Sequence, residues 1–232
     1  MSITMNEKIY RLFIVLLISF GASEIDAKTL ETKTGKSSSL GLYLSADVFG
    51  YIYPVFVKDK YYSSEVSATL DINNRFFPAV EVGLGYTDMV SQLYEIGYRT
   101  RAPYYRIGVD YNVLYKKDKP GYIYIGARVG YTSFDYSVEA PPLVDPVWGG
   151  ETLVQFTDLP CRAVWAEAIC GVRAEIAKNF YMGWSLRYKY LFYEGPISNG
   201  GPWYVPGFGA GKKTAFGATY TFCYYFNLSR KK

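Results

Sequence analysis

The sequence predicts an all-β fold: an eight-stranded antiparallel up-and-down transmembrane β-barrel with a filled polar lumen. Three observations lead to this prediction. Apolar and polar residues alternate with a period of two in eight segments, the charged residues of these segments keep to one face, and short and long connections follow each other along the chain. A period of two is typical of strands, and alternating connection lengths are typical of a barrel that crosses a membrane.

The hairpin between Tyr104 and Tyr136 is the clearest of these segments. From Tyr105 to Tyr115 every second side chain is apolar or aromatic, and the residues between them are polar or glycine as far as Asn112. A polar turn with proline and glycine follows at 116–121, and the alternation resumes from Ile123 to Tyr131. Each arm has about eleven residues, which is near the length that a tilted strand needs to cross the hydrocarbon layer.

The same alternation predicts six further strands, at residues 40–52, 65–72, 77–87, 163–176, 181–192 and 216–226. The segment 163–176 also contains alanine and glutamate, which favour helices. Its charged residues from Glu167 to Glu175 nevertheless share one parity, which a period of two explains and a helical period does not. We therefore expect a strand there as well.

The predicted connections alternate in length. Short turns are expected near 73–76, 116–121 and 177–180, and long loops near 53–64, 88–102, 137–162 and 194–213. No strand is expected within 137–162, because this loop contains Pro141, Pro142, Pro146 and Pro160. Short turns at one rim and long loops at the other place both termini on the periplasmic side, as in a bacterial outer-membrane barrel.

The two faces of the predicted strands differ in charge. The apolar face carries no Asp, Glu, Lys or Arg in any of the eight segments. An Arg or Lys at the bilayer midplane would cost about 2–4 kcal/mol, so this face suits contact with lipid. A soluble lipocalin-like barrel would show the opposite arrangement, with polar residues outside and an apolar cavity inside.

The polar face is expected to line the lumen and to form a network of paired charges. Its members are Asp47, Asp71, Glu81, Arg106, Asp110, Arg128, Glu167, Arg173, Glu175, Arg187 and Lys189. Eight strands leave an interior just wide enough for side chains. Glycines of the same parity make room for the long side chains; they are Gly83, Gly85, Gly108, Gly126, Gly130, Gly171, Gly183 and Gly217. We therefore expect a filled lumen.

The chain outside the barrel is expected to be short. Lys8 and Arg11 precede an apolar run at 12–20 and a region of small residues, which predicts a signal peptide over residues 1–27. A flexible mature N-terminus is expected at 28–39, the outer-membrane barrel at 40–227 and a basic tail at 228–232.

The composition excludes several kinds of chemistry. The chain contains no histidine, which removes histidine-dependent catalytic triads and imidazole metal sites. Glu167 and Glu175 carry carboxylates that could perform acid–base chemistry, but a structural ion network is the favoured interpretation. No catalytic, cofactor-binding or metal-binding residue is assigned, and the net charge of +4 is not concentrated in a nucleic-acid-binding patch.

The three cysteines are an odd number, which cannot all pair within the chain. Cys161 is expected in a loop. Cys170 and Cys223 are expected on non-adjacent strands with opposite facing. We therefore expect no structural disulfide.

Over residues 40–227 the chain resembles the eight-stranded bacterial outer-membrane barrels, and the run FFPAVEVGLGY at 76–86 is similar to uncharacterised barrel families of Bacteroidetes. The resemblance implies a location in the bacterial outer membrane, with outer-membrane lipid and the barrel-assembly machinery as partners. Such barrels often end on an aromatic residue, whereas here Phe226 is followed by Asn-Leu-Ser-Arg-Lys-Lys. The lack of histidine separates the chain from the lipid A deacylases and proteases among similar barrels.

Three functions agree with this sequence. The first is a non-enzymatic structural or interaction role, with a protein partner bound at the loops or at the periplasmic rim. The second is binding or transport of a small molecule or lipid by a barrel that is porin-like in architecture. Trp148, Trp203 and the tyrosine-rich loops could bind a ligand or a partner, although aromatic residues near strand ends more often form the belts at the membrane interface. The third is a membrane-embedded enzyme that does not depend on histidine.

Overall fold

The structure is a computed structural model of the whole chain. It describes residues 40–48, 50, 61–91, 95–116, 121–144, 149, 151–197, 201–210 and 213–228. The predicted signal peptide, the predicted flexible segment 28–39 and the tail beyond Leu228 lie outside the described residues.

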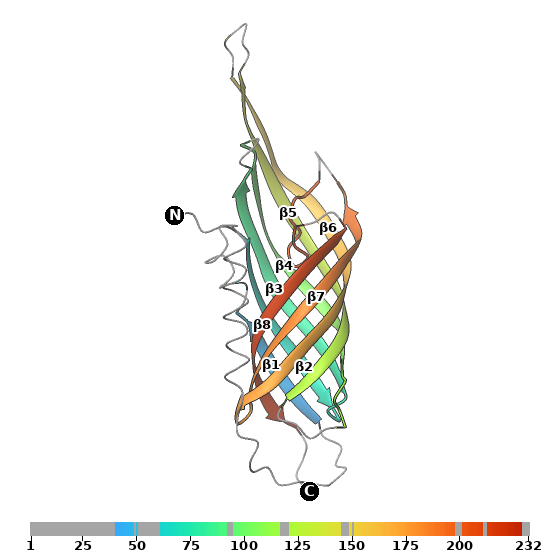
Figure 1. Cartoon of the computed structure of the whole chain (residues 1–232). Coiled ribbons are helices and arrows are strands. Elements are labelled where there is room, and N and C mark those ends of the chain that lie inside the picture. The colour runs from blue at the N-terminus through green and yellow to red at the C-terminus, as the bar shows by residue number, and fades with distance from the viewer. Residues whose placement is uncertain are drawn as a thin grey trace, which may run out of the picture. The chain divides into compact units, whose positions relative to one another are not determined.

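The described residues form eight antiparallel strands in a closed ring (Figure 1). Each strand pairs with its neighbours in the chain, and β1 closes the ring by pairing with β8. The strands are β1 (Leu40–Asp47), β2 (Tyr61–Ile72), β3 (Phe76–Val90), β4 (Gly97–Asn112), β5 (Gly121–Val144), β6 (Glu151–Ala177), β7 (Phe180–Gly195) and β8 (Thr214–Asn227). This topology confirms the predicted eight-stranded up-and-down barrel. In the described part of the chain, no helix is long and apolar enough to cross a membrane.

Asparagines shape two of the short turns. Asn73 and Asn74 have φ values of 58° and 53°, and Asn179 has a φ of 65°. Asparagine tolerates this left-handed conformation better than most residues. The Asp71 carboxylate stabilises the first turn by accepting a hydrogen bond from the Asn74 amide nitrogen at 2.7 Å.

Four strands, β2, β3, β4 and β7, continue into segments that the sequence analysis assigned to loops. β2 begins at Tyr61, within the predicted loop 53–64, and the predicted loop 88–102 is shortened because β3 runs to Val90 and β4 begins at Gly97. The alternation is lost there because exposed polar residues occupy the outer face. One example is Arg99, which pairs with Asp88 at 3.3 Å. β7 likewise extends to Gly195.

The prediction that no strand occurs within 137–162 is wrong. β5 runs to Val144 and β6 begins at Glu151, so Pro141, Pro142 and Pro160 lie in strands, and Cys161 does too. Pro146 lies outside the described residues.

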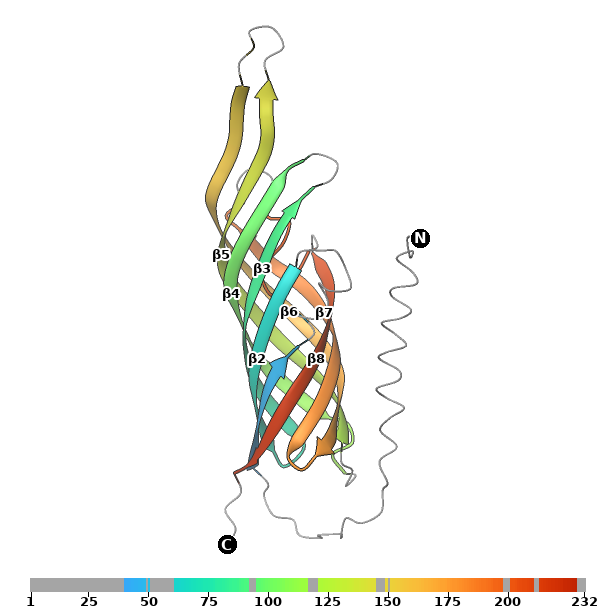
Figure 2. The same cartoon turned by 90° about the vertical axis from the view of Figure 1, so that its left-hand side faces the viewer.

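The prolines are tolerated because they lie on strand segments with one free edge. The β4–β5 pairing ends at Gly97 and Glu139, and the β6–β7 pairing ends at Arg162 and Gly195. On such an edge the missing N–H of a proline removes no ladder hydrogen bond. Pro141 and Pro142 are consecutive and cannot both face the free edge, but they lie where the β5–β6 register shifts, between Ala140 and Leu143, so the ladder is already interrupted there. Figure 2 shows this β5–β6 hairpin extending beyond the ends of the other strands.

The outer face of the barrel is apolar and bounded by aromatic rings. Val80, Ile107 and Leu186 are 52%, 63% and 59% exposed. We call the rim with the short turns the turn side and the rim with the long loops the loop side. Pairs of aromatic rings lie on the outer face at two levels. Those on the turn side are Phe76–Tyr111 and Phe180–Tyr224, and those on the loop side are Tyr62–Tyr86 and Tyr188–Phe216. On β3 the two levels are marked by Phe76 and Tyr86, which are ten residues apart. At about 3.3 Å per residue and a tilt of about 40°, this corresponds to a band about 25 Å high.

Candidate functional site

The barrel interior is filled by three layers of side chains. Two aromatic layers enclose a central charge cluster. The turn-side layer contains Tyr43, Phe77, Tyr122 and Tyr124, and the loop-side layer contains Tyr98, Tyr104, Phe134, Tyr136, Trp165, Tyr204 and Phe208. The central charge cluster consists of Glu65, Glu81, Arg106, Asp110, Arg128, Glu167, Arg187 and Lys189, all of them buried. Its four carboxylates are balanced by three guanidinium groups and one ammonium group. Such balance is needed because an uncompensated charge is costly to bury.

Strand register places opposite charges beside each other around the ring. Glu81 of β3 lies opposite Arg106 of β4, and Arg128 of β5 lies opposite Glu167 of β6. Glu167 also lies opposite Lys189 of β7. The charge cluster is therefore built from cross-strand neighbours, which long side chains then extend across the lumen.

Glu81 is the centre of the cluster because it contacts three arginines from three strands. Its carboxylate accepts hydrogen bonds from Arg187 Nη1 at 2.7 Å, Arg128 Nε at 3.1 Å and Arg106 Nη1 at 3.2 Å. Arg128 also donates from Nη1 and Nη2 to the two carboxylate oxygens of Asp110, at 2.7 and 2.8 Å. Charge-assisted bonds with this paired geometry are among the strongest in proteins.

Glu65 and Glu167 complete the cluster. Glu65 binds Arg106, and it accepts a hydrogen bond from Arg187 Nη2 at 3.1 Å. Glu167 accepts hydrogen bonds from Arg187 Nη1 at 3.2 Å and from Trp165 Nε1 at 2.7 Å. Arg106 Nε lies 2.8 Å from Glu167 Oε1 but makes no well-directed hydrogen bond, so this contact is an ion pair only.

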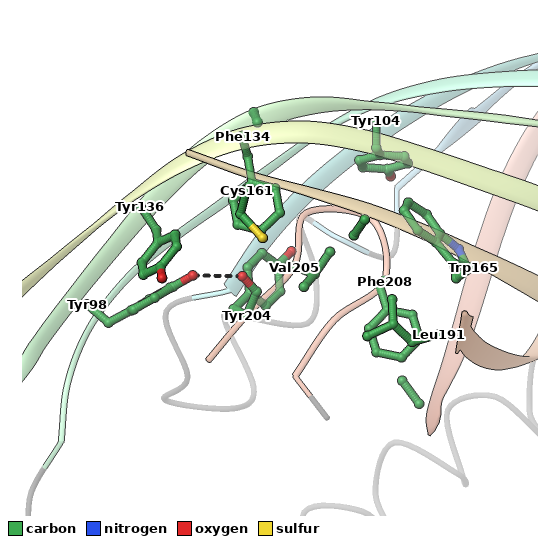
Figure 3. Close-up of a cluster of buried hydrophobic side chains, with 13 residues drawn as sticks. Tyr98, Tyr104, Phe134, Tyr136, Cys161, Trp165, Leu191, Tyr204, Val205 and Phe208 are labelled. Carbon is green, nitrogen blue, oxygen red and sulfur yellow. Dashed lines mark hydrogen bonds between the residues drawn. The ribbon is translucent and has the colours of Figure 1, made fainter. Parts of the chain in front are cut away.

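Part of the β7–β8 connection folds into the barrel on the loop side. We call residues 203–210 the plug loop. Val205 and Gly209 form an isolated antiparallel bridge, and Gly207 and Gly209 take φ values of 81° and 112° that favour glycine. Tyr204, Val205 and Phe208 are buried among the aromatic side chains of the loop-side layer (Figure 3).

Hydrogen bonds join the plug loop to the barrel wall. The Tyr98 hydroxyl donates to the Tyr204 carbonyl at 2.8 Å, which is the dashed line in Figure 3. Lys189 Nζ donates to the carbonyls of Gly207 and Phe208 at 2.7 and 3.1 Å, and Arg106 Nη2 donates to Gly207 at 2.8 Å. The central charge cluster therefore binds the plug loop directly.

The aromatic members of the plug loop continue the packing. Phe208 lies edge to face with Trp165, with ring centroids 6.2 Å apart, and Tyr204 stacks on Tyr61 at 5.1 Å. Burial raises the pKa of Tyr204 to about 12. The sequence analysis treated this segment as an ordinary loop. Tyr204, Val205 and Phe208 are large apolar or aromatic residues, and such a group is unusual in an exposed loop.

Arg173 lies in the turn-side layer, apart from the central charge cluster. Its guanidinium carbon is 4.7 Å from the ring centroid of Tyr43 and 5.7 Å from that of Tyr122, and Nη1 donates to the Tyr122 hydroxyl at 2.9 Å. Cation–π contacts with aromatic faces therefore accompany this hydrogen bond.

The structure brings together seven of the eleven predicted luminal charges and leaves four elsewhere. Asp47 accepts a hydrogen bond from the Tyr220 amide nitrogen, and Asp71 binds Asn74. Glu175 accepts hydrogen bonds from the Asn179 amide nitrogen and the Tyr181 hydroxyl. These three carboxylates and Arg173 are thus not members of the central charge cluster.

Glu65 is the member of the central charge cluster that the sequence analysis omitted. It has the same parity as Asp71 on β2, so the period of two contains the signal that identifies it.

The three cysteines are unpaired: Cys161 and Cys223 are buried and Cys170 is exposed. Among the described residues, no group of three or more His, Cys, Asp or Glu side chains has an arrangement that could hold a metal ion.

These features define a closed eight-stranded β-barrel with a filled lumen and an apolar outer wall. Within that class, the chain belongs to the family described as "Domain of unknown function (DUF6048)", whose model matches residues 5–231. A search of curated proteins found no match.

Solved structures similar to this chain include three bacterial proteins. Neisserial surface protein A shares 14% identity at a TM-score of 0.37, covering 82% of this chain and 94% of that one. A major outer membrane protein from Thermus thermophilus shares 9% identity at a TM-score of 0.48, and the match covers 82% of this chain and 100% of that one. Ail, the attachment invasion locus protein of Yersinia pestis, shares 11% identity at a TM-score of 0.40, and the match covers 82% of this chain and 97% of that one.

With identities and TM-scores this low, the barrel assignment rests on the closed ring of strands itself. None of the comparisons supports the resemblance to Bacteroidetes families that was drawn from residues 76–86.

Proposed function

We propose that this protein is an integral barrel of a bacterial outer membrane that has no enzymatic activity and acts by binding a protein partner through its β5–β6 hairpin. The observation that carries the proposal is the contrast between an interior filled with side chains and a hairpin that extends beyond the barrel. Because charges and the plug loop fill the lumen, the exposed rims are the surfaces left for interaction.

The outer wall supports the membrane location. Its exposed apolar side chains form a band bounded by aromatic rings, with a height of about 25 Å that matches the apolar band of outer-membrane barrels. A soluble protein rarely exposes a continuous apolar surface of this extent. The charged residues of the wall instead point inward, where Glu81, Arg106 and Arg187 are at most 6% exposed.

The filled lumen predicts that the purified protein forms no steady pore. In planar-bilayer recordings, the wild-type protein is expected to show no stable conductance steps, whereas Arg128→Ala removes a large luminal side chain and is expected to show openings. Stable channels from the wild type would favour transport over partner binding.

The β5–β6 hairpin has the composition of a binding surface for a basic partner. Between Ser133 and Cys161 the sequence contains five acidic residues and no Lys or Arg. Glu139 of β5 and Asp158 of β6 are exposed, and Phe156 of β6, which lies opposite Val138 of β5, is 40% exposed. Prolines and charges on free edges discourage strand addition, so we expect a partner to bind through side-chain contacts.

Site-specific photo-crosslinking in native membranes tests this role. A crosslinking residue at Phe156, on the hairpin, is expected to give discrete protein adducts that weaken when Glu139 and Asp158 are both changed to lysine. The same residue at Phe180, an exposed aromatic at the turn-side level, serves as the matched control. Adducts that form only from position 180 would place the interaction at the periplasmic turns, and an absence of adducts from both positions would contradict an interaction role.

A further inference from the structure

The turn-side rim carries an arginine that aromatic rings hold at the edge of the apolar band. Arg75 belongs to the turn between β2 and β3, and it is exposed. Its guanidinium carbon lies 5.1 Å from the ring centroid of Phe76, 5.7 Å from that of Tyr111 and 4.8 Å from that of Tyr115. Phe76 and Tyr111 form one of the ring pairs that mark the turn-side level on the outer face. The charge of Arg75 therefore lies where the apolar band ends.

Hydrogen bonds fix the turn that carries Arg75. The Arg75 carbonyl accepts a hydrogen bond from the Asn112 amide nitrogen at 3.0 Å. The Asn112 side chain is buried, and its Nδ2 donates to the Asn74 carbonyl at 2.9 Å. Its Oδ1 accepts a hydrogen bond from the Leu114 amide nitrogen at 2.8 Å. Asn112 thus joins this turn to the chain that follows β4, so the aromatic contacts of Arg75 rest on a fixed backbone.

Lys116 is a second exposed cation at the same place. Its Nζ lies 5.7 Å from the ring centroid of Tyr115, the ring that also contacts Arg75. Among the described residues, neither cation has a carboxylate within ion-pair distance, whereas Arg99 on the loop side pairs with Asp88. Two like charges beside one ring repel each other, and an anion that reaches both would replace this repulsion with attraction.

The sequence gives the two turns a net positive charge. Residues 73–75 and 113–121 contain four basic residues and one acidic residue: Arg75, Lys116, Lys117, Lys119 and Asp118. The structure describes the first two of these. Asp71 and Asp110, the carboxylates that precede the two turns in the chain, are each 4% exposed and accept hydrogen bonds from Asn74 and Arg128. They therefore do not neutralise the outer face of this rim.

The level of the two cations indicates which kind of anion they meet. The aromatic residues of outer-membrane barrels lie at the two edges of the hydrocarbon layer, where the lipid headgroups begin. A cation on the outer face at this level is beside the headgroups. A soluble polymer would instead meet the ends of the turns.

We propose that Arg75 and Lys116 bind the phosphate of an anionic phospholipid in the leaflet that surrounds the turn side. The rings of Phe76, Tyr111 and Tyr115 hold the guanidinium group in position, and the acyl chains of the lipid lie along the apolar band next to them. This inference rests on the membrane location proposed above, and it is independent of partner binding by the β5–β6 hairpin.

Lipid binding to the purified full chain tests the proposal. The protein is held in neutral detergent and titrated with phosphatidylglycerol and with phosphatidylcholine of the same acyl chains, and bound lipid is counted by native mass spectrometry. Phosphatidylglycerol is expected to bind at least about tenfold more tightly, a difference of about 1.4 kcal/mol. Equal binding by a protein that folds into phosphatidylcholine vesicles would overturn this inference alone. Failure to insert into vesicles of either lipid would instead contradict the membrane location.

Soluble anions distinguish a lipid site from a general anion site. Inorganic phosphate and poly-glutamate are added in separate experiments, at the same concentration of anionic groups as the phosphatidylglycerol. Both are expected to displace little of the bound lipid, because neither has an acyl chain that can lie along the apolar band. Displacement by either one as complete as that by free phosphatidylglycerol would show a site for a soluble anion and overturn the proposal.

Two arginine variants locate the site. Arg75→Gln is expected to reduce the preference for phosphatidylglycerol at least about fivefold, the effect of one basic residue near an anionic membrane surface. Arg99→Gln removes an exposed arginine on the loop side and is expected to keep the preference. Heat-modifiable gel migration checks that each variant is folded. A folded Arg75→Gln protein with the wild-type preference would contradict the assignment.

A third variant tests the aromatic support and covers the case in which Arg75→Gln does not fold. Tyr115→Leu keeps both cations and removes the ring that they share. The preference for phosphatidylglycerol is expected to fall at least about twofold, which corresponds to one exposed cation–π contact. An unchanged preference in the folded Tyr115→Leu protein would overturn the proposal that this ring positions the cations for the lipid.

Discussion

Glu81→Gln is expected to lower the free energy of unfolding by about 3–5 kcal/mol, because it removes the charge that three buried arginines share. The glutamine keeps the size of the side chain, so the loss reports the charge rather than the packing. Arg106, Arg128 and Arg187 all contact Glu81, and each is at most 6% exposed. Denaturant unfolding of the refolded protein in lipid vesicles, followed by the gel shift, measures the change.

Glu139→Gln provides the matched control for this prediction. Glu139 is an exposed glutamate of β5 whose side chain accepts a hydrogen bond from Gln155 at 3.0 Å. Loss of an exposed polar contact is expected to change the unfolding free energy by less than about 0.5 kcal/mol. If both variants lost the same small amount, the central charge cluster would be water-filled and weakly coupled, contrary to the packing described here.

Ile107→Arg is expected to reduce the unfolding free energy by about 2–4 kcal/mol, because it places a guanidinium group on the lipid-facing wall. Ile107 is 63% exposed and lies between Val80 and Val129 on the neighbouring strands, near the middle of the apolar band. Folded yield and denaturant unfolding in lipid vesicles measure this loss.

Thr157→Arg is the comparison for the lipid-facing variant, because Thr157 is an exposed strand residue on the β5–β6 hairpin outside the apolar band. Arginine there remains in water, and no measurable loss of stability is expected. A loss from Thr157→Arg equal to that from Ile107→Arg would show that the band does not face lipid.

The strand phases could be predicted because a period of two depends only on neighbouring residues. Arg106 and Asp110 share a parity, and both are buried in the lumen as that parity requires. The same local rule applies to Glu65, which shares the parity of Asp71 on β2 and is buried as well.

The ends of the strands could not be predicted in the same way. Above the apolar band the outer face meets water and carries polar residues such as Arg99 and Asp88, so apolar and polar residues no longer alternate in the sequence although the side chains still alternate in facing. The proline-containing arms of β5 and β6 depend on where β4 and β7 stop, and this is a property of the sheet rather than of the segment. The residues of one segment therefore do not determine where its strand begins or ends.

The sequence by itself determined that this chain forms eight alternating strands with an uncharged outer face and charges directed inward, because the facing of each side chain follows from the pleat of its own strand. The tertiary structure alone decided which charges meet. Glu81 and Arg187, 106 residues apart, are joined across the lumen only once the ring has closed. It also decided that the plug loop enters the barrel, because Lys189 and Arg106 reach the Gly207 carbonyl only after β4 and β7 are in place. The face on which a side chain lies is a local property of the chain, whereas the residues that it contacts depend on register, ring closure and loop packing.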